Sequence, residues 1–409
     1  MLDIKRRQVL AGLLALLPAP RPLAAMACDD GRPVALGETR RIFIDAANPA
    51  ETWADIARPD DAEAMRGLVR AVMADVRRKP SWAAGWSIAT KFAYYAIYKP
   101  FGLYMAESDY FAGLLGPKLV AKSDMAGLQR LYTLAHAGCS TVLAWDARRN
   151  RMVHFRSLDW PSADAIAKAT RIFAGTRRDG STAFSAAGIL GMTGLLTAVK
   201  PGFSVAINFA PWKGTSFSLN ADPTFLVRQL MTSAVASYHE AFRVIEAWHP
   251  GAPVFISLCG IAKGEGCVFE FGAAWDEHGP CHPIGIGERD FLIQTNHFDE
   301  SGPFARQNRA QAAGSPWDDP AWDAHTILET SVARKTLIEQ ALLAAYGAGQ
   351  DFDVEETLRE AFIRRPVWNC ETAQWVGMSP EAGQMRAWIR SPALDGRQPP
   401  AGLMPRSSP

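Results

Sequence analysis

Three residue types that could build a nucleophilic site occur close together in the chain. Cys139 follows Gly138 where the residue pattern changes from helical to strand-like, and Arg156 and Asp159 come shortly after it. A thiol becomes a good nucleophile when a base or a nearby positive charge favours the thiolate. Arginine can supply that charge, and aspartate can orient a proton-accepting amine. The spacing alone leaves a second interpretation equally open, namely a buried structural cysteine beside an Arg156–Asp159 ion pair.

The familiar catalytic motifs do not match. Residues 85–89 approach G-x-S-x-G but follow no strand, and His239-Glu240 lacks the second histidine of HExxH. No phosphate-binding glycine loop is present. The six cysteines, Cys28, Cys139, Cys259, Cys267, Cys281 and Cys370, form no CxxC pair, so no structural zinc site is expected. Their disulfide pairing cannot be read from the sequence.

A β-hairpin would bring the three candidates together. Residues 140–145 read as a strand, residues 146–150 as a turn, and residues 152–155 as the returning strand. Cys139 would then lie at the tip of one strand, and Arg156 and Asp159 at the far end of the next.

The remaining segments alternate between strand and helix patterns. A helix is expected over about 65–76, where apolar residues recur at helical spacing, and further helices over 224–248, 321–347 and 354–363. Strands are expected near 170–174, 182–198, 203–208, 253–258, 267–272 and 291–295, with a last pair in 367–390. Residues 28–58 look irregular. The order of elements indicates an α+β fold.

Residues 81–137 are unusually aromatic and are expected to be mostly helical. Two interpretations are open: a buried helical layer, which we favour, or an exposed apolar surface for lipid-like substrates or membrane contact.

Composition excludes several functional classes. The 409 residues are 48% hydrophobic, enough for a large core, and the formal net charge is +1. A near-neutral chain does not favour sequence-independent nucleic-acid binding, which requires a basic excess.

The first 27 residues read as a twin-arginine-type signal peptide. Lys5-Arg6-Arg7 precedes a short apolar stretch and then a small-residue region ending at Ala27. The apolar stretch is too short to span a bilayer. This pattern predicts export, to a bacterial periplasm or the exterior.

Several segments resemble the acid ceramidase and N-acylethanolamine acid amidase family of N-terminal-nucleophile cysteine hydrolases, relatives of bile-salt hydrolases and penicillin V acylases. The similar segments are residues 138–142, 154–160, 193–205, 263–268 and 294–298, in the family's order. Arg309 falls where the family has an arginine downstream of its asparagine. These matches favour Cys139 as a nucleophile over a structural cysteine.

The resemblance implies an αββα sandwich and a chain that cuts itself between Gly138 and Cys139. Residues 28–138 would form a mostly helical N-terminal chain, and residues 139–409 the catalytic chain. The freed α-amine of Cys139 would act as the base, Asp159 would orient it, and Arg156 would favour the thiolate. Asn296 would donate to the oxyanion, and Arg309 would position Asp159 or the substrate.

The implied substrate is a lipid-like N-acyl amide, such as a ceramide or an N-acylethanolamine, and no metal or organic cofactor is suggested. The cleaved N-terminal chain could stay bound, and Cys28 and Cys370 could link the two chains. Two alternatives remain: an acyltransferase of the same fold, and an exported lipid-binding protein that has lost its activity.

Overall fold

The fold below is that of a computed structural model of the chain. It describes residues 31–77, 91, 94–95, 102–129, 138–160, 162–212, 222–273, 281–308, 327–347, 349 and 352–391. The predicted signal peptide (residues 1–27) and Cys28 lie outside these residues.

Two sheets organise the described residues. The smaller has six strands in the order β1-β14-β13-β4-β3-β12. Its strands are β1 (Arg32–Ala35), β3 (Gly138–Asp146), β4 (Arg151–Asp159), β12 (Phe291–Gln294), β13 (Thr372–Ser379) and β14 (Gln384–Ser391). All neighbours in it are antiparallel.

The larger sheet has eight strands in the order β11-β10-β9-β8-β7-β6-β5-β2. Its strands are β2 (Thr39–Phe43), β5 (Thr170–Thr176), β6 (Thr182–Ile189), β7 (Thr197–Lys200), β8 (Phe203–Phe209), β9 (Val254–Cys259), β10 (Gly266–Phe271) and β11 (Cys281–Gly285). Only the β2–β5 pair is parallel.

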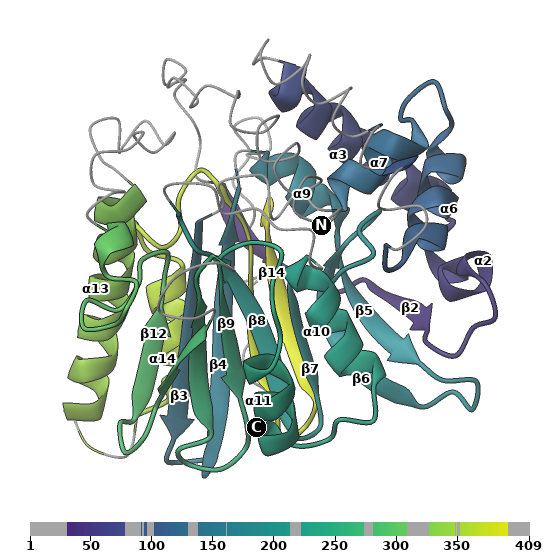
Figure 1. Cartoon of the computed structure of the whole chain (residues 1–409). Coiled ribbons are helices and arrows are strands. Elements are labelled where there is room, and N and C mark those ends of the chain that lie inside the picture. The colour runs from purple at the N-terminus through teal and green to yellow at the C-terminus, as the bar shows by residue number, and fades with distance from the viewer. Residues whose placement is uncertain are drawn as a thin grey trace, which may run out of the picture.

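Helices cover the outer faces of both sheets, as Figure 1 shows. The helices α13 (Ile327–Gly347) and α14 (Val354–Phe362) pack on the smaller sheet, with Ile338 and Leu358 in one core with Val142 and Phe155. The helices α10 (Pro223–Thr232) and α11 (Tyr238–Glu246) pack on the larger one. A smaller apolar cluster, including Ala206 and Val376, fills part of the space between the sheets. The expected α+β class and αββα layering are confirmed.

The N-terminal segment contributes more than helices. Besides α2 (Pro49–Thr52), α3 (Pro59–Arg77), α6 (Met105–Leu115) and α7 (Lys122–Leu128), it supplies β1 to one sheet and β2 to the other. The expectation that residues 28–58 are irregular is therefore wrong. The strand β2, Thr39-Arg40-Arg41-Ile42-Phe43, was missed because a buried arginine interrupts its apolar alternation.

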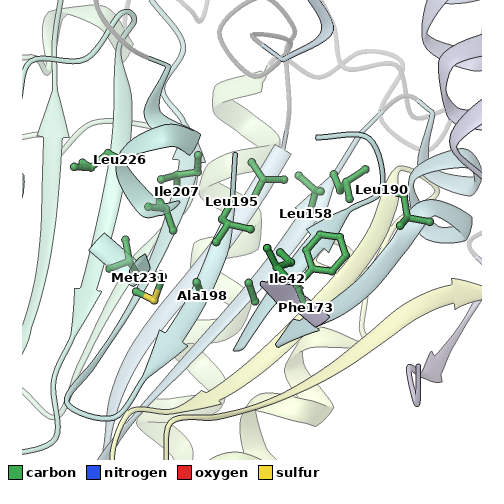
Figure 2. Close-up of a cluster of buried hydrophobic side chains, with 14 of the residues drawn as sticks. Ile42, Leu158, Phe173, Leu190, Leu195, Ala198, Ile207, Leu226 and Met231 are labelled. Carbon is green, nitrogen blue, oxygen red and sulfur yellow. The ribbon is translucent and has the colours of Figure 1, made fainter. Parts of the chain in front are cut away.

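That buried arginine has a specific partner. Asp61 of α3, fully buried, accepts from Arg40 and lies 2.9 Å from a guanidinium nitrogen of Arg171 on β5. Nearby, Ile42 of β2 packs in the main core with Phe173 of β5, as seen in Figure 2. The edge strand is thus held by an ion-pair network and by apolar burial together.

Other boundaries differ from the prediction for local reasons. The helix expected over 224–248 is two helices, because Ser237 and Glu240 form a capping box that starts α11. The strand expected over 182–198 is β6 and β7 with a loop between them. The short helix α9 (Ala163–Ala169) and β11 were not predicted.

Of the aromatic segment 81–137, the described part supports burial for some residues and exposure for others. Phe111 and Tyr94 are buried, whereas Tyr95 is 68% exposed. Trp82, Trp86 and several others lie outside the described residues. Within the described part of the chain, no helix has the length and apolar character needed to cross a bilayer.

Candidate active site

The predicted hairpin is present and places the candidate nucleophile at its open end. β3 and β4 pair in register, so that Gly138 lies opposite Asp159 and Cys139 opposite Leu158. Because side chains alternate along a strand, Cys139 and Arg156 point between the sheets. Ser140 and Asp159 point toward α13. Two sets of groups therefore reach Cys139 from opposite faces.

On the inner face, the guanidinium of Arg156 contacts the thiol. Its Nη2 donates to Cys139 Sγ at 3.2 Å and to the Ile207 carbonyl at 3.1 Å. The residue is 1% exposed, and its Nε and Nη1 have no hydrogen-bond partner among the described residues. The guanidinium of Arg156 is therefore placed to interact directly with the sulfur of Cys139.

On the outer face, Arg334 of α13 and Asn296 surround the backbone of Cys139. The Cys139 N–H donates to Asn296 Oδ1 at 2.8 Å, and Arg334 Nη2 donates to the same oxygen at 2.7 Å. Arg334 Nη1 donates to the Cys139 carbonyl and to Ser140 Oγ. Asn296 Nδ2 donates to the Phe209 carbonyl at 2.7 Å.

The carboxyl group of Asp159 lies beside this arginine and is fully buried. Its Oδ1 accepts from Thr372 Oγ1 at 2.8 Å, and its Oδ2 lies 3.7 Å from Arg334 Nη1. Burial raises the pKa of Asp159, and Arg334 opposes that rise. Burial has the opposite effect on the arginine and lowers the pKa of Arg334. The buried carboxyl group thus lies beside the guanidinium that donates to the Cys139 carbonyl.

The structure thus brings together Gly138, Cys139, Arg156, Asp159 and Asn296. Arg309, the remaining candidate, lies outside the described residues. The arginine that contacts Cys139 and Asn296 is Arg334, which sequence reasoning missed. Its signal is present: Arg334 shares a helical stripe with the buried residues Ser331, Ile338 and Leu342. A charged residue on such a stripe is a candidate for a buried polar site.

Two other segments used in the resemblance have structural roles here. In the β7–β8 turn, Gly202 has a φ of +106°, and a Cβ there would lie 2.0 Å from the Ala236 carbonyl. Preceding it, Lys200 donates to carbonyls at the end of α10. In the turn at 263–266, Glu265 Oε2 accepts from the Ile261 and Ala262 amides.

An apolar cavity lies between the N-terminal segment and the strands that follow the hairpin. The cavity is partly open to solvent, and apolar side chains line it. α3 and α7 form one wall. Trp160, Ile166 and the stretch 189–192 with Leu196 form the rest. Trp160 directly follows Asp159 in the chain, and the apolar lining of the cavity is compatible with a hydrocarbon group.

The described residues offer no grouping of His, Cys, Asp and Glu side chains suited to a metal ion. Among the described cysteines, Cys139, Cys259, Cys267 and Cys281 are free thiols and Cys370 is in a disulfide. Cys28 lies outside the described residues, and the Cys28–Cys370 link stays a prediction.

The chain is similar to two curated proteins, which confirms the resemblance seen in the sequence. It is 25% identical over 211 residues to acid ceramidase of Balaenoptera acutorostrata scammoni, covering 43% of this chain and 49% of that protein. It is 25% identical over 184 residues to the N-acylethanolamine-hydrolyzing acid amidase of Caenorhabditis elegans, covering 42% of this chain and 50% of that protein. The chain thus spans about half the length of the curated relatives it matches.

Among solved structures, a Caenorhabditis elegans N-acylethanolamine-hydrolyzing acid amidase ortholog superposes with a TM-score of 0.45 and 19% identity. That match covers 62% of this chain and 100% of the other. No protein-family model matches the chain.

Proposed function

We propose that this chain is a self-cleaving amidohydrolase that hydrolyses the amide bond of N-acyl amides through Cys139. The observation that carries the proposal is the two-sided arrangement around Cys139. Arg156 lies at its sulfur, Asn296 and Arg334 contact its backbone, and Asp159 lies beside Arg334. The similarity to ceramidase and amidase proteins over part of the chain supports the same activity.

Self-cleavage would come first. The sulfur of Cys139 attacks the carbonyl carbon of Gly138, the C–N bond breaks, and the nitrogen of Cys139 takes up a proton. Water then hydrolyses the resulting thioester. The products are an N-terminal chain ending at Gly138 and a catalytic chain whose new α-amine has an ordinary pKa of about 8.

Amide hydrolysis would reuse the same groups. The α-amine accepts the thiol proton as Cys139 attacks the substrate carbonyl, and it returns a proton to the departing amine. Water then hydrolyses the acyl thioester. Asp159 would accept from the amine, and Arg334 would hold the Cys139 carbonyl. An Asn296 amide donor for the oxyanion would contribute about 3–4 kcal/mol to the transition state.

The apolar cavity supports a fatty acyl chain as the substrate's acyl part. Its walls include Leu68 and Val72 of α3 and Leu128 of α7, all N-terminal to the cleavage point. The cleaved N-terminal chain would therefore have to stay bound for the cavity to persist.

Several contacts support that retention. β1 and β2 each pair with a strand from beyond Gly138. Glu107 of α6 accepts two hydrogen bonds from Arg228 of α10 and one from Trp53, and the guanidinium lies 4.2 Å from the centre of the Tyr104 ring.

We also propose export through the N-terminal signal, and contact with a lipid surface through exposed Tyr95 and Leu103.

The test is the intact mass and N-terminal sequence of every fragment, for the wild type and for Cys139→Ala. Turnover of N-palmitoylethanolamine and a ceramide is measured in parallel. We expect a fragment beginning at Cys139, and hydrolysis, only in the wild type. Cleavage with acyl transfer to an added amine would favour the acyltransferase. An uncleaved, inactive wild type would favour the lipid-binding protein.

A further inference from the structure

A buried cluster of two hydroxyls and an imidazole, those of Ser331, Thr295 and His297, contacts the backbone of Asn296. Ser331 Oγ accepts from the Asn296 backbone N–H at 2.6 Å and donates to Thr295 Oγ1 at 2.9 Å. His297 Nδ1 lies 2.8 Å from Ser331 Oγ and 3.2 Å from Thr295 Oγ1. Ser331 and Thr295 are fully buried, and His297 is 9% exposed.

The 2.8 Å separation of Ser331 and His297 resembles a nucleophile and its base, but the surroundings exclude that role. Ser331 Oγ has no access to solvent, and one of its two lone pairs is already occupied by the Asn296 N–H. In either tautomer of the ring, the hydroxyl keeps that donor. The cluster is therefore suited to hold the backbone of Asn296, and not to attack a substrate.

The imidazole is neutral at ordinary pH. Burial, helped by the nearby Lys335 and Arg334 and opposed by a smaller effect of Asp299, lowers the pKa of His297 to about 4. The unprotonated nitrogen of a neutral ring can accept a hydrogen bond from a neighbouring hydroxyl. A charged ring would instead add a third donor to the cluster.

We propose that Ser331 is a positioning residue for Asn296, acting with Thr295 and His297 through the backbone amide of Asn296. Ser331 lies one helical turn before Arg334 on α13, and Arg334 Nη2 fixes the side-chain oxygen of Asn296. One helix thus holds both the backbone and the side chain of the residue that would donate to the oxyanion. This inference rests on the proposed function for its catalytic meaning, but its geometry can be tested separately.

The experiment compares Ser331→Ala with Ser108→Ala in the full-length protein. Ser108 is also fully buried on a helix, and its Oγ has no hydrogen-bond partner among the described residues, which makes it a matched control. With N-palmitoyl aminocoumarin as the probe, we expect kcat to fall roughly 10- to 100-fold in Ser331→Ala with KM within about twofold. Ser108→Ala should match the wild type.

A crystal structure of each variant gives a readout that does not depend on turnover. We expect the contact between Asn296 Oδ1 and Cys139 N to lengthen or disappear in Ser331→Ala and to persist in Ser108→Ala. An unmoved Asn296, or an unchanged kcat, overturns the positioning role even if the wild type is a good hydrolase. Conversely, a displaced Asn296 in a protein without turnover supports the positioning role and refutes only the proposed function. Should Ser331→Ala fail to fold, the second variant is Thr295→Val, which removes the hydroxyl that accepts the hydrogen bond from Ser331. The same changes in kcat and in the position of Asn296 are then expected.

Discussion

The structure places Arg334 at the backbone of Cys139, a residue that the sequence resemblance did not indicate. The substitution Arg334→Lys tests this assignment. Arg334 donates to the Cys139 carbonyl, to Ser140 Oγ and to Asn296 Oδ1. A lysine keeps the charge beside Asp159, but its single ammonium on a differently shaped stem can keep about one of these three partners. Hydrogen bonds to a charged group contribute about 1.5–3 kcal/mol each, so losing two costs about 3–6 kcal/mol.

That cost is a large share of a typical free energy of unfolding of about 5–15 kcal/mol. We therefore expect a clearly lower Tm, self-cleavage slowed by at least about 100-fold, and turnover lost in proportion. The assays are thermal unfolding, the time course of the fragment beginning at Cys139, and hydrolysis of N-palmitoylethanolamine. Normal cleavage in Arg334→Lys would refute the assignment. If Arg334→Lys does not fold, Ser140→Ala removes one acceptor and should slow cleavage by a smaller factor.

Three further outcomes follow from the described contacts. Burial raises the pKa of Glu270 from 4.5 to about 8, so its contribution to stability is complete below pH 4.5 and is lost as the pH rises through 8. Glu270→Gln should flatten the dependence of Tm on pH in that interval, and an unchanged slope would contradict this. Glu107→Gln removes the carboxylate that Arg228 binds. After cleavage, the variant should release its N-terminal chain at lower denaturant concentrations than the wild type in size-exclusion chromatography, provided Cys370 is reduced. Gly202→Ala should lower Tm by several degrees because the new Cβ would meet the Ala236 carbonyl. A Tm equal to that of the wild type would show that the turn can move aside.

Local patterns were sufficient for the hairpin and for most strands and helices. The segment from Gly138 to Asp159 consists of two runs rich in apolar residues around a short polar turn, and its two strands pair over their whole length. Such local signals also located Cys139, Arg156 and Asp159 on neighbouring strands. The α+β class followed from the order of these elements.

Elements stabilised by distant partners could not be predicted in this way. The strand β2 carries Arg40 on its buried side, and the strand is compatible with a sheet only because Asp61, which also accepts from Arg171, neutralises and bonds that side chain. Their separation along the chain hides the pairing from any local pattern. β11 is similarly obscure, because its side chains are mostly exposed or half-buried and show no regular alternation.

The contrast between local signals and distant contacts also explains which site residues could be predicted. Asn296 was found because it lies in a recognisable short segment. Arg334 was not, because it lies 38 residues further along the chain and outside any recognised segment. What fixes Arg334 is its position on α13. It shares the buried stripe with Ile338 and Leu342, whose packing on the smaller sheet orients the guanidinium toward Cys139. An arginine on an apolar helical stripe requires a buried partner, and here the partners are the acceptors around the candidate nucleophile. A search for polar residues on buried stripes would have identified both Arg334 and Ser331 from the sequence, whereas Arg309, the arginine that the resemblance indicated, lies outside the described residues.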